Sequence, residues 1–196
     1  MLFNSENKAI EKNDVNFFEA GIIEDVKLEG AELKTTPTGK RLIEVSFTKG
    51  GAKLVSSEWE PEKRETDTQE DYERQCSGFL SRLLDILGCF YPEDQLKVNV
   101  ETFTELANWF ISKVQMADKT KLVRVKAVYN KNGYVVLAGG YRYTFIEPMT
   151  IAKDNSKIRI LAKDVIVRPE KEVDDINDLK KESTTNSKNL PFLVFS

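Results

Sequence analysis

The chain has 196 residues, of which 40% are hydrophobic and 31% are charged, and its 29 basic and 32 acidic side chains leave a net charge of −3. This size corresponds to one globular domain that needs neither disulfides nor metal to fold. The sequence contains no histidine and two cysteines, which excludes Ser-His and Cys-His nucleophile pairs and a four-ligand structural zinc site. Near-neutral charge gives no global attraction to nucleic acid, so any such binding must come from a local cluster of cations.

The sequence carries no signal for a membrane or for secretion. No apolar run reaches the roughly 18 residues of a membrane span, and the opening MLFNSENKAIEKND lacks a basic patch followed by a hydrophobic core. Cys76 and Cys89 lie in an apolar helical pattern, where buried free thiols are the favoured interpretation. We therefore expect a protein of a reducing cytoplasm with no membrane partner.

The first part of the chain predicts an arm followed by three strands. Residues 1–16 have little apolar periodicity and are interpreted as an N-terminal arm, and the ordered domain is expected over residues 17–168. FFEAGIIEDVKL alternates as a strand does, and the turn-rich segment that follows predicts a loop. RLIEVSFT and AKLVSSEWE, which flank Gly50-Gly51, have the pattern of a β-hairpin.

The middle of the chain predicts a helical insertion over about residues 67–116. Asp67 or Thr68 can cap a first helix, in which apolar residues recur at steps of three and four. Thr102 and Glu105 have the spacing of a capping box at the start of a second helix. Both helices are expected to pack on the core.

Strand patterns return after the helices. LVRVKAVY places apolar side chains on one face and Arg124 and Lys126 on the other, and Asn132-Gly133 closes a hairpin onto YVVLAGG. The runs YRYTFIE and IRILAKDVIV are expected to add further strand. From residue 169 the composition becomes acidic and polar and then ends in the apolar LPFLVFS, so residues 169–196 are interpreted as a C-terminal tail.

The order of these elements predicts an α+β fold that is mainly β. Alternating βα units are absent, which argues against a parallel doubly wound sheet. A five-stranded antiparallel barrel with a helical insertion between strands 3 and 4 is the plan of the OB-fold. We expect an OB-like barrel of this kind, with a different antiparallel α+β arrangement as the main alternative.

Several segments carry a resemblance to a known family. The run FFEAGIIEDVKLEGAELKTTPTGKRLIEVSFT, a Trp-bearing third strand, and VRVKAVYNKNGYVVLAGGYRYTFIE resemble the small OB-fold single-stranded DNA-binding proteins of tailed bacteriophages, over about residues 17–147. The resemblance implies a non-catalytic protein of phage DNA replication or recombination that works in the cytoplasm of the bacterial host. It implies no cofactor.

The C-terminal tail is also similar to those of such proteins, which often end in an acidic stretch closed by a phenylalanine. In the family, this tail recruits replication proteins. The matching residues here are Asp174, Asp175, Asp178, Phe192 and Phe195. The resemblance therefore implies that replication proteins are partners of the tail.

Sequence-tolerant binding of single-stranded DNA needs cations that follow the phosphates and aromatic faces on which bases stack. Lysines and arginines interleave with aromatic residues near the expected loops and on the fourth strand. An alternative reading is that these cations serve solubility and protect sheet edges. The candidate nucleic-acid-binding residues are Lys34, Lys40, Arg41, Trp59, Arg124, Lys126, Lys131, Tyr134, Tyr141, Arg142 and Tyr143.

The two tryptophans receive different interpretations. Trp109 lies among apolar residues of the second helix and is expected in the core. Trp59 is flanked by Glu58 and Glu60 at the end of the third strand, where it fits either a packing role at the rim or a platform for base stacking.

The sequence contains no catalytic constellation. The acid-rich stretch from Glu58 to Glu73 is interpreted as a solvated face, because neighbouring carboxylates on a loop have no burial to raise a pKa and no fixed geometry for an ion. We therefore expect a binding protein and not an enzyme. The alternative function is a structural or protein-interaction module, such as a virion component, that uses the barrel edges and the tail and forms a homo-oligomer.

Overall fold

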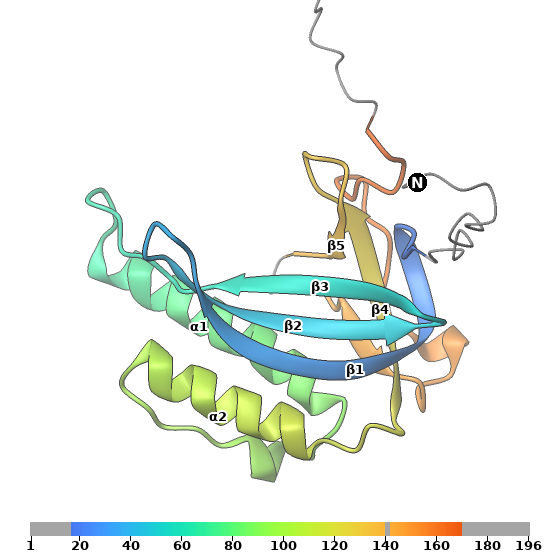
Figure 1. The fold of residues 1–196 in the computed structure, drawn as a ribbon, viewed down its shortest axis with the longest axis horizontal. Helices are drawn as coiled ribbons and strands as arrows, with labels where there is room; N and C mark the ends of the chain where they lie inside the picture. Colours follow the sequence, from blue (N-terminus) through green and yellow to red (C-terminus); the bar gives the residue numbers. More distant parts are fainter. Residues whose placement is uncertain (1–16, 140–141, 170–196) are drawn as a thin grey trace, which may run out of the picture.

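Figure 1 shows the architecture of the chain in the computed structural model, which describes residues 17–139 and 142–169. Two α-helices and two short 3-10 helices accompany a six-stranded sheet. In chain order the elements are β1 (Gly21–Thr35), β2 (Arg41–Lys49), β3 (Ala52–Trp59), α1 (Gln69–Gly88), a 3-10 helix (Glu93–Leu96), α2 (Phe103–Met116), β4 (Leu122–Tyr129), β5 (Val135–Leu137), β6 (Ile146–Pro148) and a 3-10 helix (Lys153–Asn155). The predicted mainly β fold, with its helices between the third and fourth strands, is confirmed.

The strands form one antiparallel sheet in the order β3-β2-β1-β4-β5, and β6 also pairs with β4. The long β1 pairs with β4 through its first half and with β2 through its second half. It bends where the register shifts between Ile23 and Val26, at Asp25, whose φ of 57° lies in the left-handed region. The edge strands β3 and β5 have Cα atoms within 8 Å of each other, but no backbone pairing joins them among the described strands. The sheet is therefore open.

Local signals place the helix starts and the hairpins as expected. Thr68 caps α1 and Thr102 caps α2, and in each helix the third residue, Asp71 or Glu105, bonds back to the backbone N–H of the cap. The hairpins at Gly50-Gly51 and at Asn132-Gly133 join β2 to β3 and β4 to β5, and their three glycines have positive φ. These predictions are confirmed.

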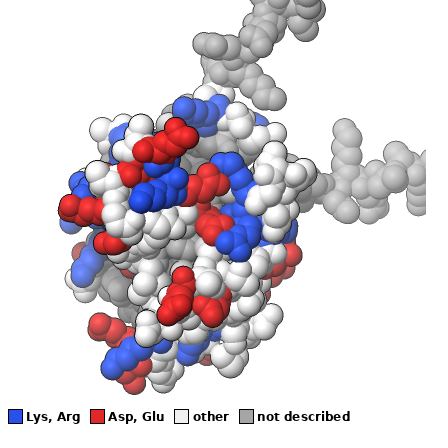
Figure 2. Space-filling model, turned by 90° about the vertical axis from the view of Figure 1, so that its left-hand side faces the viewer, with Lys and Arg blue, Asp and Glu red and all other residues white. Residues whose placement is uncertain are grey.

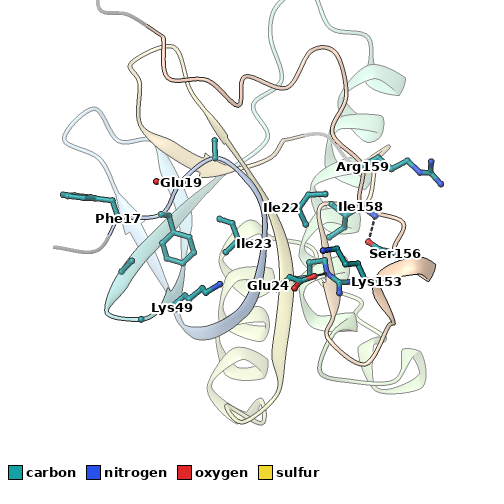
Figure 3. Close-up of a pocket in the computed structure, with 15 residues that line it drawn as sticks. Phe17, Glu19, Ile22, Ile23, Glu24, Lys49, Lys153, Ser156, Ile158 and Arg159 are labelled. Carbon is teal, nitrogen blue, oxygen red and sulfur yellow. Dashed lines mark hydrogen bonds and ion pairs between the residues drawn. The ribbon is translucent and has the colours of Figure 1, made fainter. Parts of the chain in front are cut away.

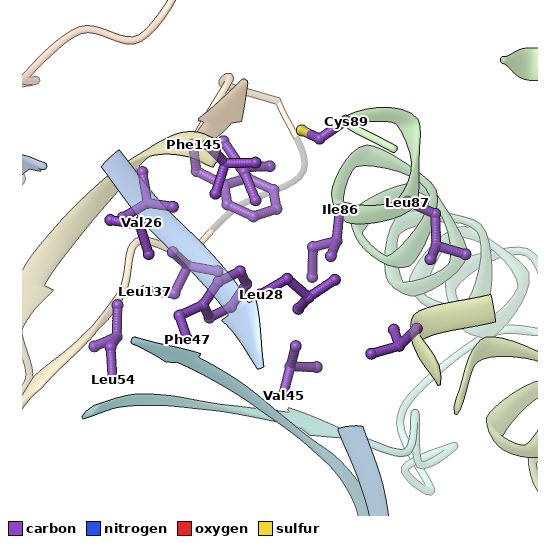
Figure 4. Close-up of a cluster of buried hydrophobic side chains, with 14 of the residues drawn as sticks. Val26, Leu28, Val45, Phe47, Leu54, Ile86, Leu87, Cys89, Leu137 and Phe145 are labelled. Atoms are coloured by element: carbon purple, nitrogen blue, oxygen red, sulfur yellow. The ribbon is translucent and has the colours of Figure 1, made fainter. Parts of the chain in front are cut away.

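The core lies between the inner face of the sheet and one side of each helix, as Figure 4 shows in part. Each fully buried Leu, Ile or Phe side chain contributes about 1.5–3 kcal/mol. Trp109 packs partly buried against this core, and of the two free thiols Cys89 is buried and Cys76 half-buried. The central residues are Leu28, Val45, Phe47 and Leu54 of the sheet, Leu83, Ile86 and Leu87 of α1, and Ala107, Phe110 and Val114 of α2.

A C-terminal strap, residues 149–168, covers the side of β4 that faces away from this core. The expected strand IRILAKDVIV does not form. Leu161 and Asp164 instead close a turn, in which the Asp164 N–H donates to the Leu161 carbonyl at 2.9 Å and its carboxylate accepts the Leu161 N–H at 2.8 Å. Of the described part of YRYTFIE, residues 142–147, only Ile146 and Glu147 belong to a strand, β6.

Candidate nucleic-acid interface

The second half of β1 forms a three-stranded part of the sheet with β2 and β3. One face of this part is turned away from the helices and from the strap (Figure 1). Leu28, Val45 and Leu54 point inward, so the alternate residues of these strands point outward. Across the three strands, the register aligns Lys34 with Leu42 and Trp59, Glu32 with Glu44 and Ser57, and Gly30 with Ser46 and Val55. We call these nine residues the outer face.

Trp59 is the large aromatic side chain of the outer face and is 49% exposed. It lines a pocket of about 400 Å³ at the end of β3, the Trp59 pocket, together with Lys40, Glu60, Pro61, Glu62, Arg64 and Gln75. The structure thus brings two predicted residues, Trp59 and Lys40, into one site. Sequence reasoning missed Arg64, because it lies inside a stretch that reads as uniformly acidic and solvated.

The predicted cations near this pocket are held by carboxylates. Lys34 Nζ lies 2.7 Å from Glu44 and 2.9 Å from Glu32, and the hydrogen bond to Glu44, followed by that to Glu32, raises the pKa of Lys34. Lys40 Nζ lies 2.8 Å from Glu62. Any phosphate that reaches these two lysines must therefore replace a carboxylate partner.

Arg41 is held in a similar way. Its Nε donates to Glu60 at 2.7 Å and a second nitrogen completes a bidentate pair, while the guanidinium lies 5.1 Å from the centroid of the Phe103 ring. The pair with Glu60 raises the pKa of Arg41. Figure 2, which views the molecule from the left-hand side of Figure 1, shows acidic and basic side chains interspersed and no continuous basic surface.

Arg124 and Lys126 do not lie on an exposed face, and this prediction is wrong. Both residues point away from the core as expected, but the strap buries them to 3% and 2% exposure. Lys126 Nζ donates to the Asp164 carboxylate at 2.8 Å and to the Arg159 carbonyl at 3.1 Å. These contacts hold the strap on β4, so Lys126 is not available to a phosphate.

Arg124 also contacts the strap, because its guanidinium donates to the Ile151 carbonyl at 3.4 Å. It donates to Glu24 at 3.0 Å and forms an ion pair with buried Glu147. Burial by itself would raise the pKa of Glu147, but hydrogen bonds from Ser156 and Arg124 outweigh burial and hold it below its usual range. Arg124 and its partners therefore stabilise the fold, and Arg124 is not available to a phosphate.

The β4–β5 hairpin carries a second, smaller group of candidate residues. Lys131 is exposed and Tyr134 is 66% exposed at the hairpin tip. The Asn130 carboxamide oxygen accepts backbone N–H groups of Asn132 and Tyr134 and fixes the tip. The Arg168 side chain of the strap lies against Gly133, within 3.6 Å of the position a Cβ would take there. Arg168 thus joins Lys131 and Tyr134, a neighbour that the sequence did not predict.

The other predicted residues are placed apart from these two groups or lie outside the described residues. Tyr143 is 48% exposed, with Lys163 Nζ 4.9 Å from its ring centroid, and Arg142 is exposed. The residues outside the described part of the chain are Tyr141 and the tail positions Asp174, Asp175, Asp178, Phe192 and Phe195.

A larger pocket, of about 1040 Å³, lies elsewhere, beside the start of β1 (Figure 3). Its apolar lining includes Phe17, which is 80% exposed, and Ile22, which is 42% exposed. Lys49, Lys153 and Arg159 stand at the same pocket. We call it the Phe17 groove, and sequence reasoning did not predict it because its lining comes from four segments that lie far apart in the sequence.

The described residues contain no group of three or more Cys, Asp or Glu side chains that could hold a metal ion. Within the same part of the chain, no helix is long and apolar enough to cross a bilayer. The sequence matches no known protein-family model, and no curated protein is significantly similar to it.

Proposed function

We propose that this chain is a non-catalytic protein that binds single-stranded DNA on the outer face of β1–β3, within an OB-like barrel. The strand order supports this proposal, because β3 and β5 are the two edges of the sheet and approach each other, as a partly open barrel requires. In OB-folds the β1–β2 and β4–β5 loops border the binding face. Here these loops carry Lys40 in one case and Lys131 with Tyr134 in the other.

The half-exposed Trp59 beside Arg64 is the observation that carries the proposal. A large aromatic ring that is half in water loses part of its burial energy, whereas a base stacked on it contributes about 1–3 kcal/mol. Its row neighbours are the uncharged Leu42 and the ion-paired Lys34. Stacking is independent of sequence, because every base has a π-face.

The phage context and the tail are parts of the same proposal. On the basis of the resemblance to phage single-stranded DNA-binding proteins, we propose that this activity serves DNA replication or recombination in a bacterial host. The acidic and apolar segments of residues 170–196 would contact replication proteins.

Trp59 also provides the test. The chain has two tryptophans, so a Trp109→Phe variant leaves Trp59 as the sole reporter. Titration with oligo(dT) should quench its fluorescence, and the slope of log K against log salt should be roughly −2 to −3.5 if about three to five phosphates are neutralised. A slope near zero, or tighter binding to duplex than to oligo(dT), would refute the proposal.

A matched pair of substitutions locates the site. Trp59→Ala should weaken oligo(dT) binding by about 1–3 kcal/mol in anisotropy titrations of a labelled strand. Phe17→Ala removes an exposed aromatic side chain from a different surface and should leave the affinity unchanged. Equal losses in both variants would show that Trp59 has no special role.

The Phe17 groove favours the second candidate function, a protein-interaction module. Contiguous exposed apolar surface marks interaction sites, and this pocket combines exposed Phe17 and Ile22 with four cations, Lys49, Arg124, Lys153 and Arg159. If this is the main function, light scattering should detect self-association that Phe17→Ala abolishes, while oligo(dT) leaves Trp59 fluorescence unchanged.

A further inference from the structure

We infer that the Trp59 pocket takes one nucleobase and prefers a base that carries an exocyclic amino group, cytosine over thymine among the pyrimidines. This inference rests on the proposed binding of single-stranded DNA and adds base selectivity to one position of the bound strand. The Trp59 pocket has a volume of about 400 Å³, which is at the lower end of the range for small-molecule sites. The Trp59 ring and Pro61 supply apolar surface for a flat ring, as stacking requires.

The pocket has a cation for the phosphate of that nucleotide. Arg64 is exposed and forms no salt bridge among the described residues, in contrast to Lys40 and Arg41. A guanidinium binds phosphate through two parallel hydrogen bonds, which makes Arg64 the natural anchor. The charges of Glu60 and Glu62 are already paired with Arg41 and Lys40, so Arg64 remains as the cation that an anion can meet.

The pocket also has acceptors for the base. One oxygen of Glu62 accepts from Lys40, and no partner of its other oxygen is found in the described part of the chain. The Gln75 side-chain N–H donates to the Asp67 carboxylate at 2.9 Å. The carbonyl oxygen of the same side chain is then left as a second acceptor for a ligand. A carboxylate accepts and never donates, so the group that meets Glu62 must be a donor.

Cytosine and thymine differ at this point. Cytosine presents an amino donor at C4, which glutamate side chains accept, whereas thymine presents a carbonyl oxygen at the same position. A thymine that took the orientation of cytosine would set its O4 against the Glu62 carboxylate, and it would have to shift in the pocket before its ring N3–H could donate there. One hydrogen bond to a charged group in a partly exposed site corresponds to about a threefold to tenfold difference in affinity.

The experiment compares oligo(dC) and oligo(dT) of equal length, at low salt and mildly alkaline pH, with the Trp109→Phe variant. We expect oligo(dC) to bind about threefold to tenfold more tightly and to quench Trp59 at lower concentration. Glu62→Gln should bring the ratio close to one, because an amide offers a donor to thymine as readily as an acceptor to cytosine. Glu65→Gln removes the same charge from an exposed residue outside the pocket and should keep the preference.

The outcomes separate this inference from the proposed function. Equal affinity of the wild-type pocket for both strands, or a preference for oligo(dT), would overturn base selectivity while leaving single-stranded DNA binding intact. Loss of the preference in both Glu62→Gln and Glu65→Gln would overturn it too, because the effect would then follow net charge. Absence of binding to either strand would overturn the proposed function itself.

Discussion

Arg82 joins the two edges of the open sheet, and its removal should strongly destabilise the fold. From α1 the guanidinium donates to Glu58 of β3 at 2.6 Å and to the Ala138 carbonyl, just after β5, at 2.8 Å. It also lies 4.2 Å from the centroid of the Phe145 ring. Arg82 therefore bridges strands that have no backbone ladder between them.

The expected cost follows from what Arg82→Met leaves behind. Glu58 is 5% exposed, so its carboxylate would stay buried, with Ser56 as its remaining hydrogen-bond donor. Breaking a buried ion pair in this way costs about 3–5 kcal/mol. A domain of this kind has a total stability of about 5–15 kcal/mol, so the variant should be marginal.

Urea unfolding followed by circular dichroism measures this cost. The double variant Arg82→Met/Glu58→Leu removes both charges and should recover most of the loss, because apolar replacements of buried pairs are often neutral. Arg74→Met, on the same helix, removes an arginine whose side chain is 57% exposed and should cost less than about 1 kcal/mol. A cost below about 1 kcal/mol for Arg82→Met, or no recovery in the double variant, would refute the bridging role.

Three further expectations concern the strap, a thiol and the tail. Burial alone would raise the pKa of Asp164, but hydrogen bonds from Lys126 and Leu161 outweigh burial and lower this pKa from 3.8. The contribution of Asp164 to stability is therefore present at neutral pH and is lost as pH falls below about 4. Asp164→Asn should therefore lower the urea midpoint at neutral pH, and the gap from wild type should close in acid; a constant gap would contradict this. Burial, together with the charges of Asp85 and Glu147, raises the pKa of Cys89 to about 12. In the Cys76→Ser variant, mass spectrometry should therefore detect no modification of the remaining thiol by iodoacetamide until urea unfolds the chain. Deleting residues 170–196 should strengthen oligo(dT) binding about twofold to fivefold, because the acidic stretch then no longer competes with phosphate, and unchanged affinity would contradict that.

Features set by neighbouring residues could be predicted from the sequence. The capping boxes at Thr68 and Thr102 and the glycine turns at Gly50-Gly51 and Asn132-Gly133 depend on a few adjacent side chains. The alternation in β4 also predicted correctly which side chains face the core. Each of these signals depends on residues that lie close together in the sequence.

Features that depend on distant segments could not be predicted. Alternation shows that Arg124 and Lys126 point away from the core, but it does not show that the strap covers them. The strap has strand-like composition, yet Asp164 uses its side chain for Lys126 and for a turn, which breaks the strand. Arg168 was missed for the same reason, since it lies against Gly133 of a hairpin far away in sequence. Arg64 was missed because it lies within an acid-rich stretch.

The double pairing of β1 has a consequence for the order of folding. The β1–β2 and β2–β3 pairings join residues close in sequence, whereas Gly21 of β1 pairs with Ala127 of β4, more than one hundred positions away. Short loops close faster, so we expect the β1–β2–β3 meander to form first and β4 to dock last. The strands that carry Trp59 would then assemble before the sheet is complete.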